Sequence, residues 1–191
     1  MLHHEETTQS DEVVASAVQA GNIDAFGELI HRYEEKMKRY AKRFLFGYDE
    51  ADDVIQEIFI KAYTNIKSFD TSRKFSPWLY RIAHNEFVNE IRKRSKEKIS
   101  FFDPDTLFPH PVAKESPEHD AEEKETKKML EKSLSLLDPK YREPLVLFYI
   151  EDLSYKEIAE VMEIPVATVG IRIKRGKETL RLHYEKQETH I

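Results

Sequence analysis

The apolar residues of this chain recur at intervals of three and four along most of its length. In the stretch from Asp24 to Phe46, for example, large side chains stand at positions 26, 29, 30, 33, 37, 40, 44 and 45. That spacing gathers them on one face of an α-helix, whereas a half-buried strand needs alternation. The 191 residues include only five glycines, which disfavours hairpin-rich β folds and glycine-lined phosphate loops. The sequence therefore predicts an all-α fold.

Eight helical segments are expected, and local signals mark where several of them begin or end. Gly21 and Gly47 follow the first two segments, at positions where a left-handed residue commonly ends a helix. Asp49 is the expected N-cap of the third segment. Ser76-Pro77 and Asp138-Pro139 each combine a capping residue with a proline at the first helical position, and predict the starts of the fourth and sixth. The fifth helical segment is expected from Met129 to Leu137.

The last part of the chain has the pattern of a helix-turn-helix. Pro144 interrupts the sixth segment and predicts a kink or a later start there. Ser154 and Glu157 form a capping box before a short helix. A turn at 163–165 then leads into a final helix over 166–184.

The stretch 97–123 separates two helical parts and differs from both in composition. It holds four of the eight prolines and carries eight acidic against two basic residues. Dense proline forbids a continuous helix and favours extended, solvated backbone. We therefore expect two small helical domains, at 11–96 and 124–185, joined by a flexible acidic, Pro-rich linker whose simplest role is that of a soluble tether.

Several classes of protein are disfavoured by what the sequence lacks. With no cysteine there is neither a disulfide framework nor a thiolate zinc site. The longest apolar run, 145–150, is far shorter than the ~18 residues of a membrane span. The first ten residues lack the basic start and apolar stretch of a signal peptide. We expect a cytoplasmic protein.

Three clusters of side chains have patterns typical of binding surfaces. The exposed side of the final helix carries several cations that can reach the phosphates and guanine edges of DNA. The alternative is that these cations form an ordinary solvent-exposed face with no ligand. The fourth segment and the loop before it contain aromatic, basic and amide side chains in alternation. Such side chains bind single-stranded nucleic acid by stacking on its bases and pairing with its backbone. The alternative is that the aromatic side chains pack in the hydrophobic core. The third segment begins with carboxylates that suit an arginine-bearing partner or merely favour the helix dipole.

For catalysis, the sequence offers only a weak cluster at His119, Asp120, Glu122 and Glu123. It lies in the linker, where nothing orders metal ligands. No Walker pattern, nucleophile elbow or HExxH motif occurs. We therefore expect neither an enzyme nor a bound metal or cofactor.

Four stretches of the sequence resemble bacterial RNA polymerase sigma factors of the extracytoplasmic-function (ECF) group in the sigma-seventy family. Before the linker they are DAFGELIHRY, DEADDVIQEIFIKAYTNI and FSPWLYRIAHNEFVNEIRKR, and after it LDPKYREPLVLFYIEDLSYKEIAEVMEIPVATVGIRIKRGKETLR. The resemblance implies a four-helix region-two domain that grips the polymerase clamp and melts the minus-ten element. It also implies a region-four domain that reads the minus-thirty-five element.

Carried over by position, the resemblance assigns roles to individual residues. The polymerase-binding residues would be Asp52, Asp53, Gln56 and Glu57. Minus-ten DNA would be bound by Phe69, Arg73, Lys74, Phe75, Arg81, His84, Asn85 and Asn89, with the 69–75 loop capturing a flipped base. Minus-thirty-five DNA would be bound by Thr168, Arg172, Lys174, Arg175 and Lys177.

The sequence departs from the family pattern at two places. Pro144 is one, and it affects the geometry of the sixth helical segment. At the other, Gly170 and Ile171 stand where relatives often have a cation and a small polar residue, so part of the usual base readout is missing. Gly170 also weakens its helix by ~1 kcal/mol relative to alanine. The promoter sequence therefore does not follow from the resemblance.

The family further implies partners: core RNA polymerase through its clamp and flap, promoter DNA, and an anti-sigma factor, often membrane-anchored, that covers both domains. A stress or envelope regulon is expected. The main alternative is a stand-alone helix-turn-helix regulator in which 11–96 senses a ligand or dimerises, and a more distant one is a small helical metal hydrolase that uses the histidines.

Overall fold

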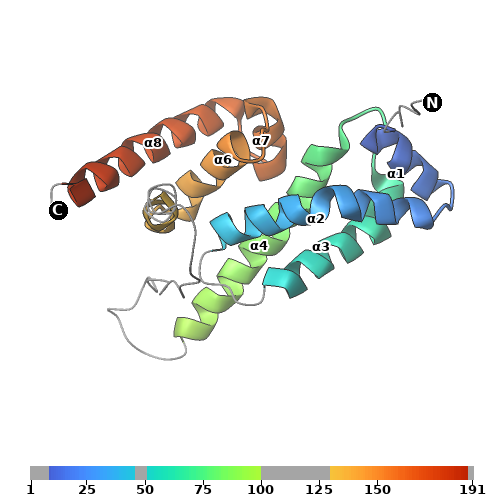
Figure 1. The fold of residues 1–191 in the computed structure, drawn as a ribbon, viewed down its shortest axis with the longest axis horizontal. Helices are drawn as coiled ribbons and strands as arrows, with labels where there is room; N and C mark the ends of the chain where they lie inside the picture. Colours follow the sequence, from blue (N-terminus) through green and yellow to red (C-terminus); the bar gives the residue numbers. More distant parts are fainter. Residues whose placement is uncertain (1–8, 46–50, 100–129, 189–191) are drawn as a thin grey trace, which may run out of the picture.

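The computed structural model describes residues 9–45, 51–99 and 130–188, and only the backbone beyond residue 93 in the second range and beyond 183 in the third. Within these ranges all regular structure is helical and no strand occurs. The predicted all-α fold with two helical domains is confirmed. Figure 1 shows the two groups of helices packed side by side.

The N-terminal domain is a bundle of four α-helices. They are α1 (Asp11–Gln19), α2 (Asp24–Phe44), α3 (Ala51–Asn65), followed by a short 3-10 turn η1 (Ile66–Ser68), and α4 (Phe75–Ile99). Gly21 adopts a φ of +103°, and this left-handed turn ends α1 as expected. The signals at Gly47 and Asp49 lie outside the described residues. Tyr40 lies at the centre of the core, with its ring against Phe44, Tyr80 and Phe87.

The C-terminal domain is smaller. A helical segment at 130–135 precedes α6 (Pro139–Tyr149), α7 (Tyr155–Met162) and α8 (Val166–Glu188). Asp138 caps α6 by accepting a hydrogen bond from the Lys140 N–H at 3.0 Å, and the Ser154–Glu157 capping box opens α7. The aliphatic side chains buried between these helices include Val146, Leu147, Ile158, Val161, Val169 and Ile173.

The predicted start of the fourth segment at Ser76-Pro77 is wrong. The helix α4 begins at Phe75, so Ser76 lies inside its first turn and does not cap it. Glu12 of α1 takes that place, because its carboxylate accepts the Phe75 N–H at 3.0 Å. The helix α6 begins at Pro139 as predicted and continues through Pro144, so the later start that was one of the two expectations for this proline is not found. The proline removes one ladder hydrogen bond near the helix N-terminus, and its side chain is buried.

The two domains share an interface in which α4 packs against α7 and α2 packs against α6. In Figure 1, α6 and α7 accordingly lie along the side of the N-terminal bundle, and α8 lies farther out. None of the helices in the described ranges is long and apolar enough to cross a membrane. The linker predicted for 97–123 lies largely in the undescribed range 100–129, and the backbone of α4 continues to Ile99.

Candidate nucleic-acid interface

The loop at 69–75 is fixed by hydrogen bonds from distant parts of the chain. The side-chain amide of Gln19, on α1, donates to the carbonyls of Ile66 and Phe69, each at 2.8 Å. Within the loop, the Asp70 carboxylate accepts from the hydroxyl and the N–H of Ser72 at 2.7 and 3.0 Å. These bonds lower the pKa of Asp70. The loop therefore has a defined shape before any ligand binds.

Phe69 and Phe75, which the sequence predicts to contact bases, are buried at the two ends of this loop. They are 5% and 1% exposed. Their rings meet edge to face with centroids 5.4 Å apart, and both pack on Trp78. Neither ring offers a free face for stacking in this conformation, so their visible role is to anchor the loop to the core.

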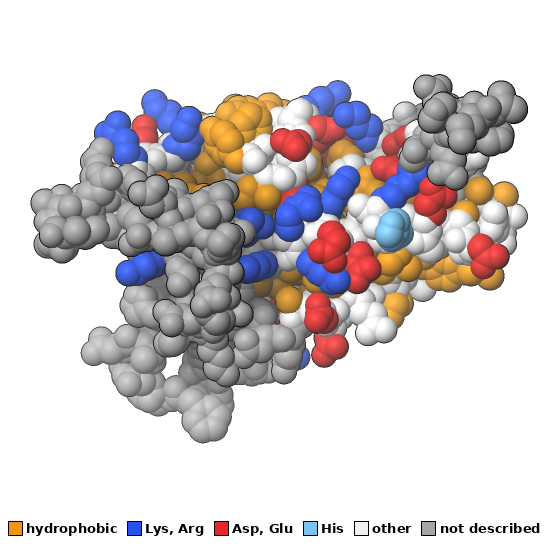
Figure 2. Space-filling model, in the orientation of Figure 1, with side chains coloured by type: hydrophobic (Ala, Val, Ile, Leu, Met, Phe, Trp, Pro, Cys, Tyr) orange, Lys and Arg blue, Asp and Glu red, His pale blue; other side chains and the backbone are white. Residues whose placement is uncertain are grey.

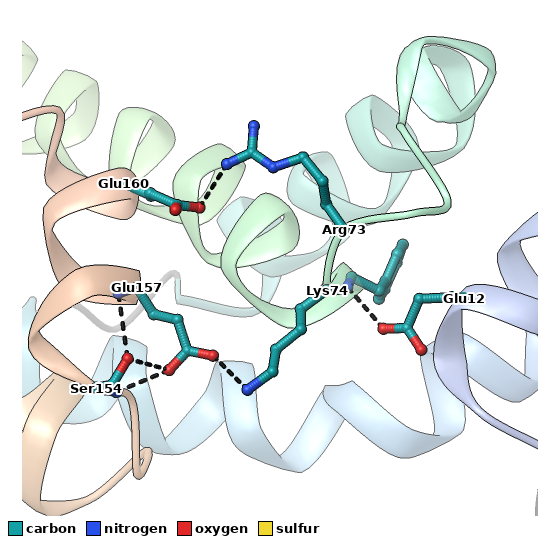
Figure 3. Close-up of polar contacts among 7 residues, drawn as sticks. Glu12, Arg73, Lys74, Ser154, Glu157 and Glu160 are labelled. Atoms are coloured by element: carbon teal, nitrogen blue, oxygen red, sulfur yellow. Dashed lines mark hydrogen bonds and ion pairs between the residues drawn. The ribbon is translucent and has the colours of Figure 1, made fainter.

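The cations of the loop point toward the C-terminal domain. The Arg73 guanidinium lies 2.8 Å from a Glu160 carboxylate oxygen, and the Lys74 ammonium lies 2.7 Å from one of Glu157 (Figure 3). The hydrogen bond that Lys74 donates to the Glu157 carboxylate raises the pKa of Lys74. Both basic side chains are still more than half exposed.

The predicted minus-ten residues of α4 divide between two faces. Asn85 and Asn89 are exposed and Arg81 is half-buried; their spacing of four residues aligns them in one stripe. His84 lies on another side of the helix, with its Nδ1 2.5 Å from a carboxylate oxygen of Glu143. The structure therefore brings three of the four together and turns the fourth toward the C-terminal domain.

The candidate polymerase-binding residues form an exposed face on α3. Asp52, Asp53, Gln56 and Glu57 are all exposed, opposite the buried Ile55, Ile58 and Phe59. Glu57 makes a long 3.6 Å contact with Lys61, whose ammonium lies closer, at 2.7 Å, to Glu86. The face therefore presents net negative charge to solvent.

The helices α7 and α8 have the geometry of a helix-turn-helix. Glu163 ends α7 in a left-handed conformation with a φ of 52°. The buried side chains of Val169 and Ile173 hold α8 against the rest of the domain. On the other side of the helix, Lys174, Arg175 and Lys177 are exposed to solvent, and Thr168 and Arg172 are half-buried. Within the described part of the chain, no ion pair involves any of these five residues.

A groove of about 440 Å³ runs beside the cations of α8. Its lining includes Tyr155, Gly170, Lys174, Lys177 and Arg181. Figure 2 shows Lys and Arg side chains gathered along the edge where Figure 1 places α8. Because Gly170 has no side chain, the Tyr155 ring is exposed at this groove, and a Cβ there would lie 3.6 Å from it.

Comparison with known proteins shows the family to which the chain belongs. Residues 29–97 match the family model for sigma-70 region 2, and residues 127–180 match that for sigma-70 region 4. The chain is 40% identical over 170 residues to the ECF RNA polymerase sigma factor SigW of Bacillus subtilis, covering 86% of this chain and 91% of that protein. The chain belongs to the ECF sigma factors.

Other relatives agree with this assignment. Sigma-H of Pseudomonas aeruginosa is 35% identical, with 91% of this chain and 93% of that protein covered. Among solved structures, CnrH in complex with the cytosolic domain of CnrY has a TM-score of 0.69 at 26% identity and covers 93% of this chain and 99% of that one. This sigma factor accordingly directs RNA polymerase to promoters and starts transcription there. A match to region 2 over 29–97 leaves no place for the ligand-sensing domain of a stand-alone regulator.

Sequence reasoning missed the residues that hold the candidate site together. Gln19 and Glu12 fix the loop from α1, and Glu143 contacts His84 from the other domain. No local pattern marks them, because their partners stand roughly 50 or more positions away in the chain. No cluster of potential metal ligands occurs in the described ranges, and the one suspected around His119 lies outside them.

Proposed function

We propose that this sigma factor uses three separate surfaces in transcription initiation. Asp52, Asp53, Gln56 and Glu57 of α3 bind the polymerase clamp. The 69–75 loop and α4 engage the melted minus-ten element, and the exposed side of α8, from Thr168 to Lys177, reads the minus-thirty-five element. The domains that carry these surfaces are 11–96 and 124–185, with 97–123 as the linker, and the C-terminal domain also contacts the polymerase flap.

The observation that carries this proposal is the separation of charge. The α3 surface is acidic and exposed, whereas α8 presents exposed cations on the opposite side of its buried stripe. An acidic helix fits the arginines of a protein partner, and a basic helix fits phosphates and guanine edges. Polymerase and promoter can therefore be bound at the same time.

The family membership also supports a proposal for how this sigma factor is regulated and where it acts. The solved relative CnrH was captured with the cytosolic domain of CnrY. An anti-sigma factor anchored in a membrane is the expected inhibitor of this chain as well. We place the protein in the cytoplasm, where it acts on a stress or envelope regulon. It has no catalytic role of its own, since polymerase supplies the chemistry.

Charge reversal on α3 tests the polymerase contact. Asp53→Arg places a cation against the arginines expected on the clamp and is expected to abolish co-migration with core polymerase on size exclusion and run-off transcription. The matched control is Glu35→Arg, the same change at a side chain of α2 that is 76% exposed. Equal polymerase binding by both variants would place the contact elsewhere.

A further inference from the structure

A large apolar side chain stands in the middle of the exposed face of α8. Ile171 is 53% exposed, although isoleucine is among the residue types that are most often buried. An α-helix turns by about 100° per residue, so Ile171 projects almost directly away from Ile173, which is buried against the rest of the domain. The isoleucine therefore occupies the centre of the proposed minus-thirty-five surface.

Cations flank this isoleucine on both sides along the helix. To one side lie Lys174 and Lys177, which line the groove beside α8. To the other side lie Arg172 and Arg175. In the major groove of DNA the two phosphate backbones lie at the edges and the base edges lie between them. A helix that is held by its flanking cations at the two backbones presents its central side chain, Ile171, to the base edges.

The position before the isoleucine adds to the apolar character of this part of α8. Gly170 has no side chain and leaves the Tyr155 ring, which is 37% exposed, open at the groove. Figure 2 shows hydrophobic side chains gathered where Figure 1 places the α7 end of α8, beside the Lys and Arg side chains. Neither Gly170 nor Ile171 has a side-chain donor or acceptor. These two positions therefore cannot recognise a base through a side-chain hydrogen bond.

Thymine is the base that such a surface can recognise, because its C5-methyl group is an apolar group in the major groove. Against any other base edge, the isoleucine would remove water from polar atoms without replacing its hydrogen bonds. We infer that Ile171 is a specificity-determining residue that contacts a thymine methyl group in the minus-thirty-five element. This inference rests on the proposed minus-thirty-five role of α8. It assigns an apolar contact to the place where the usual hydrogen-bonded readout is missing.

Exchange of thymine for uracil tests this contact, because it removes the methyl group and leaves the base pair intact. The probe is a promoter duplex whose minus-thirty-five element has been selected from a randomised pool by the holoenzyme, which is this chain with core polymerase. Each thymine of the selected element, on either strand, is then replaced in turn by deoxyuridine. The wild-type holoenzyme is expected to bind about fourfold more weakly after the exchange at one position, the usual effect of one apolar carbon group.

The variant Ile171→Ser identifies the side chain that makes the contact. Isoleucine and serine have similar helix propensities, and the site is exposed, so the variant is expected to fold. It should bind the thymine and the uracil duplex of the sensitive position with equal affinity. The matched control is Leu182→Ser, because Leu182 is also 53% exposed on α8 but lies about 16 Å farther along the helix. The control is expected to keep the fourfold preference for thymine.

Two results would overturn the thymine contact: a wild-type holoenzyme that is indifferent to every uracil exchange, or an Ile171→Ser variant that keeps the wild-type preference. The variant Arg175→Ala separates this failure from failure of the proposed function. If Arg175→Ala weakens promoter binding but no exchange of thymine for uracil does, only the thymine contact is rejected. If Arg175→Ala binds as wild type does and the pool gives no preferred sequence, the proposed minus-thirty-five role of α8 is rejected, and the thymine contact with it.

Discussion

The two surfaces of this sigma factor that we propose to bind DNA differ in how they are built and in what contacts them. The proposed minus-ten surface depends on long-range contacts: Gln19 and Glu12 of α1 hold the loop, and the C-terminal domain pairs its cations. The exposed side of α8 is set by its own helix and by packing on α6. The first is an occupied surface, because its loop is already ordered but Arg73 and Lys74 are paired with carboxylates. The exposed side of α8 is an open surface, because its cations can contact a ligand without any change in the chain.

The largest expected effect is on the open surface. Arg175→Ala should weaken promoter binding by the holoenzyme by ~1–3 kcal/mol and relax preference at one base pair, because an exposed arginine on a recognition helix can bind a guanine edge. Lys177→Ala should weaken binding to all sequences alike, since a lysine contacts phosphate. Competition binding across a set of promoter variants measures both effects. Unaltered binding by the two variants would mean that α8 does not enter the groove.

A smaller effect is expected from the packing that positions this helix. A Cβ at Gly176 would lie 2.7 Å from Leu145 Cδ1 and 3.1 Å from the Tyr141 carbonyl oxygen, whereas one at Gly170 would make ordinary contact. Gly176→Ala should destabilise the protein by about 1–2 kcal/mol through this crowding. Gly170→Ala, on the same helix, should stabilise it by up to ~1 kcal/mol.

Urea unfolding of the two alanine variants supplies the measurement, and each is the control for the other. Both gain helix propensity, so a difference between them isolates the contact with α6. If both variants are stabilised, α8 does not depend on the close approach at Gly176.

The sequence predicted the features that depend on neighbouring residues. The Ser154–Glu157 capping box and the cap at Asp138 are local, and both are present. The contacts of Glu12, Glu143 and Glu151 are not, because each joins elements far apart in the chain. A pattern of aromatic residues among cations does not distinguish rings that stack on bases from rings that pack on one another. In this structure the rings of Phe69 and Phe75 pack on one another, and their contact with DNA remains a prediction.

The smallest predicted effect concerns the occupied surface and its pH dependence. Burial opposes ionisation of Glu12, but the hydrogen bonds from the Phe75 N–H and neighbouring groups outweigh it, so the pKa of this carboxyl lies below its ordinary value. A lowered folded-state pKa means that Glu12 adds stability above the pKa of the unfolded chain. That contribution is lost as the pH falls through the folded-state pKa.

The Glu12 contribution should be about 0.5 kcal/mol, the usual size for a carboxylate at a helix N-terminus. Glu12→Gln keeps an oxygen acceptor for the Phe75 N–H but removes the ionisation. Its free energy of unfolding should therefore lie below that of wild type at pH 7 and converge with it toward pH 3. Chemical unfolding of both proteins across this range measures the difference, with Glu35→Gln as an exposed control. A gap that stays constant with pH would show that the α4 cap does not depend on the charge of Glu12, and that this loop is held chiefly by Gln19 and the buried rings.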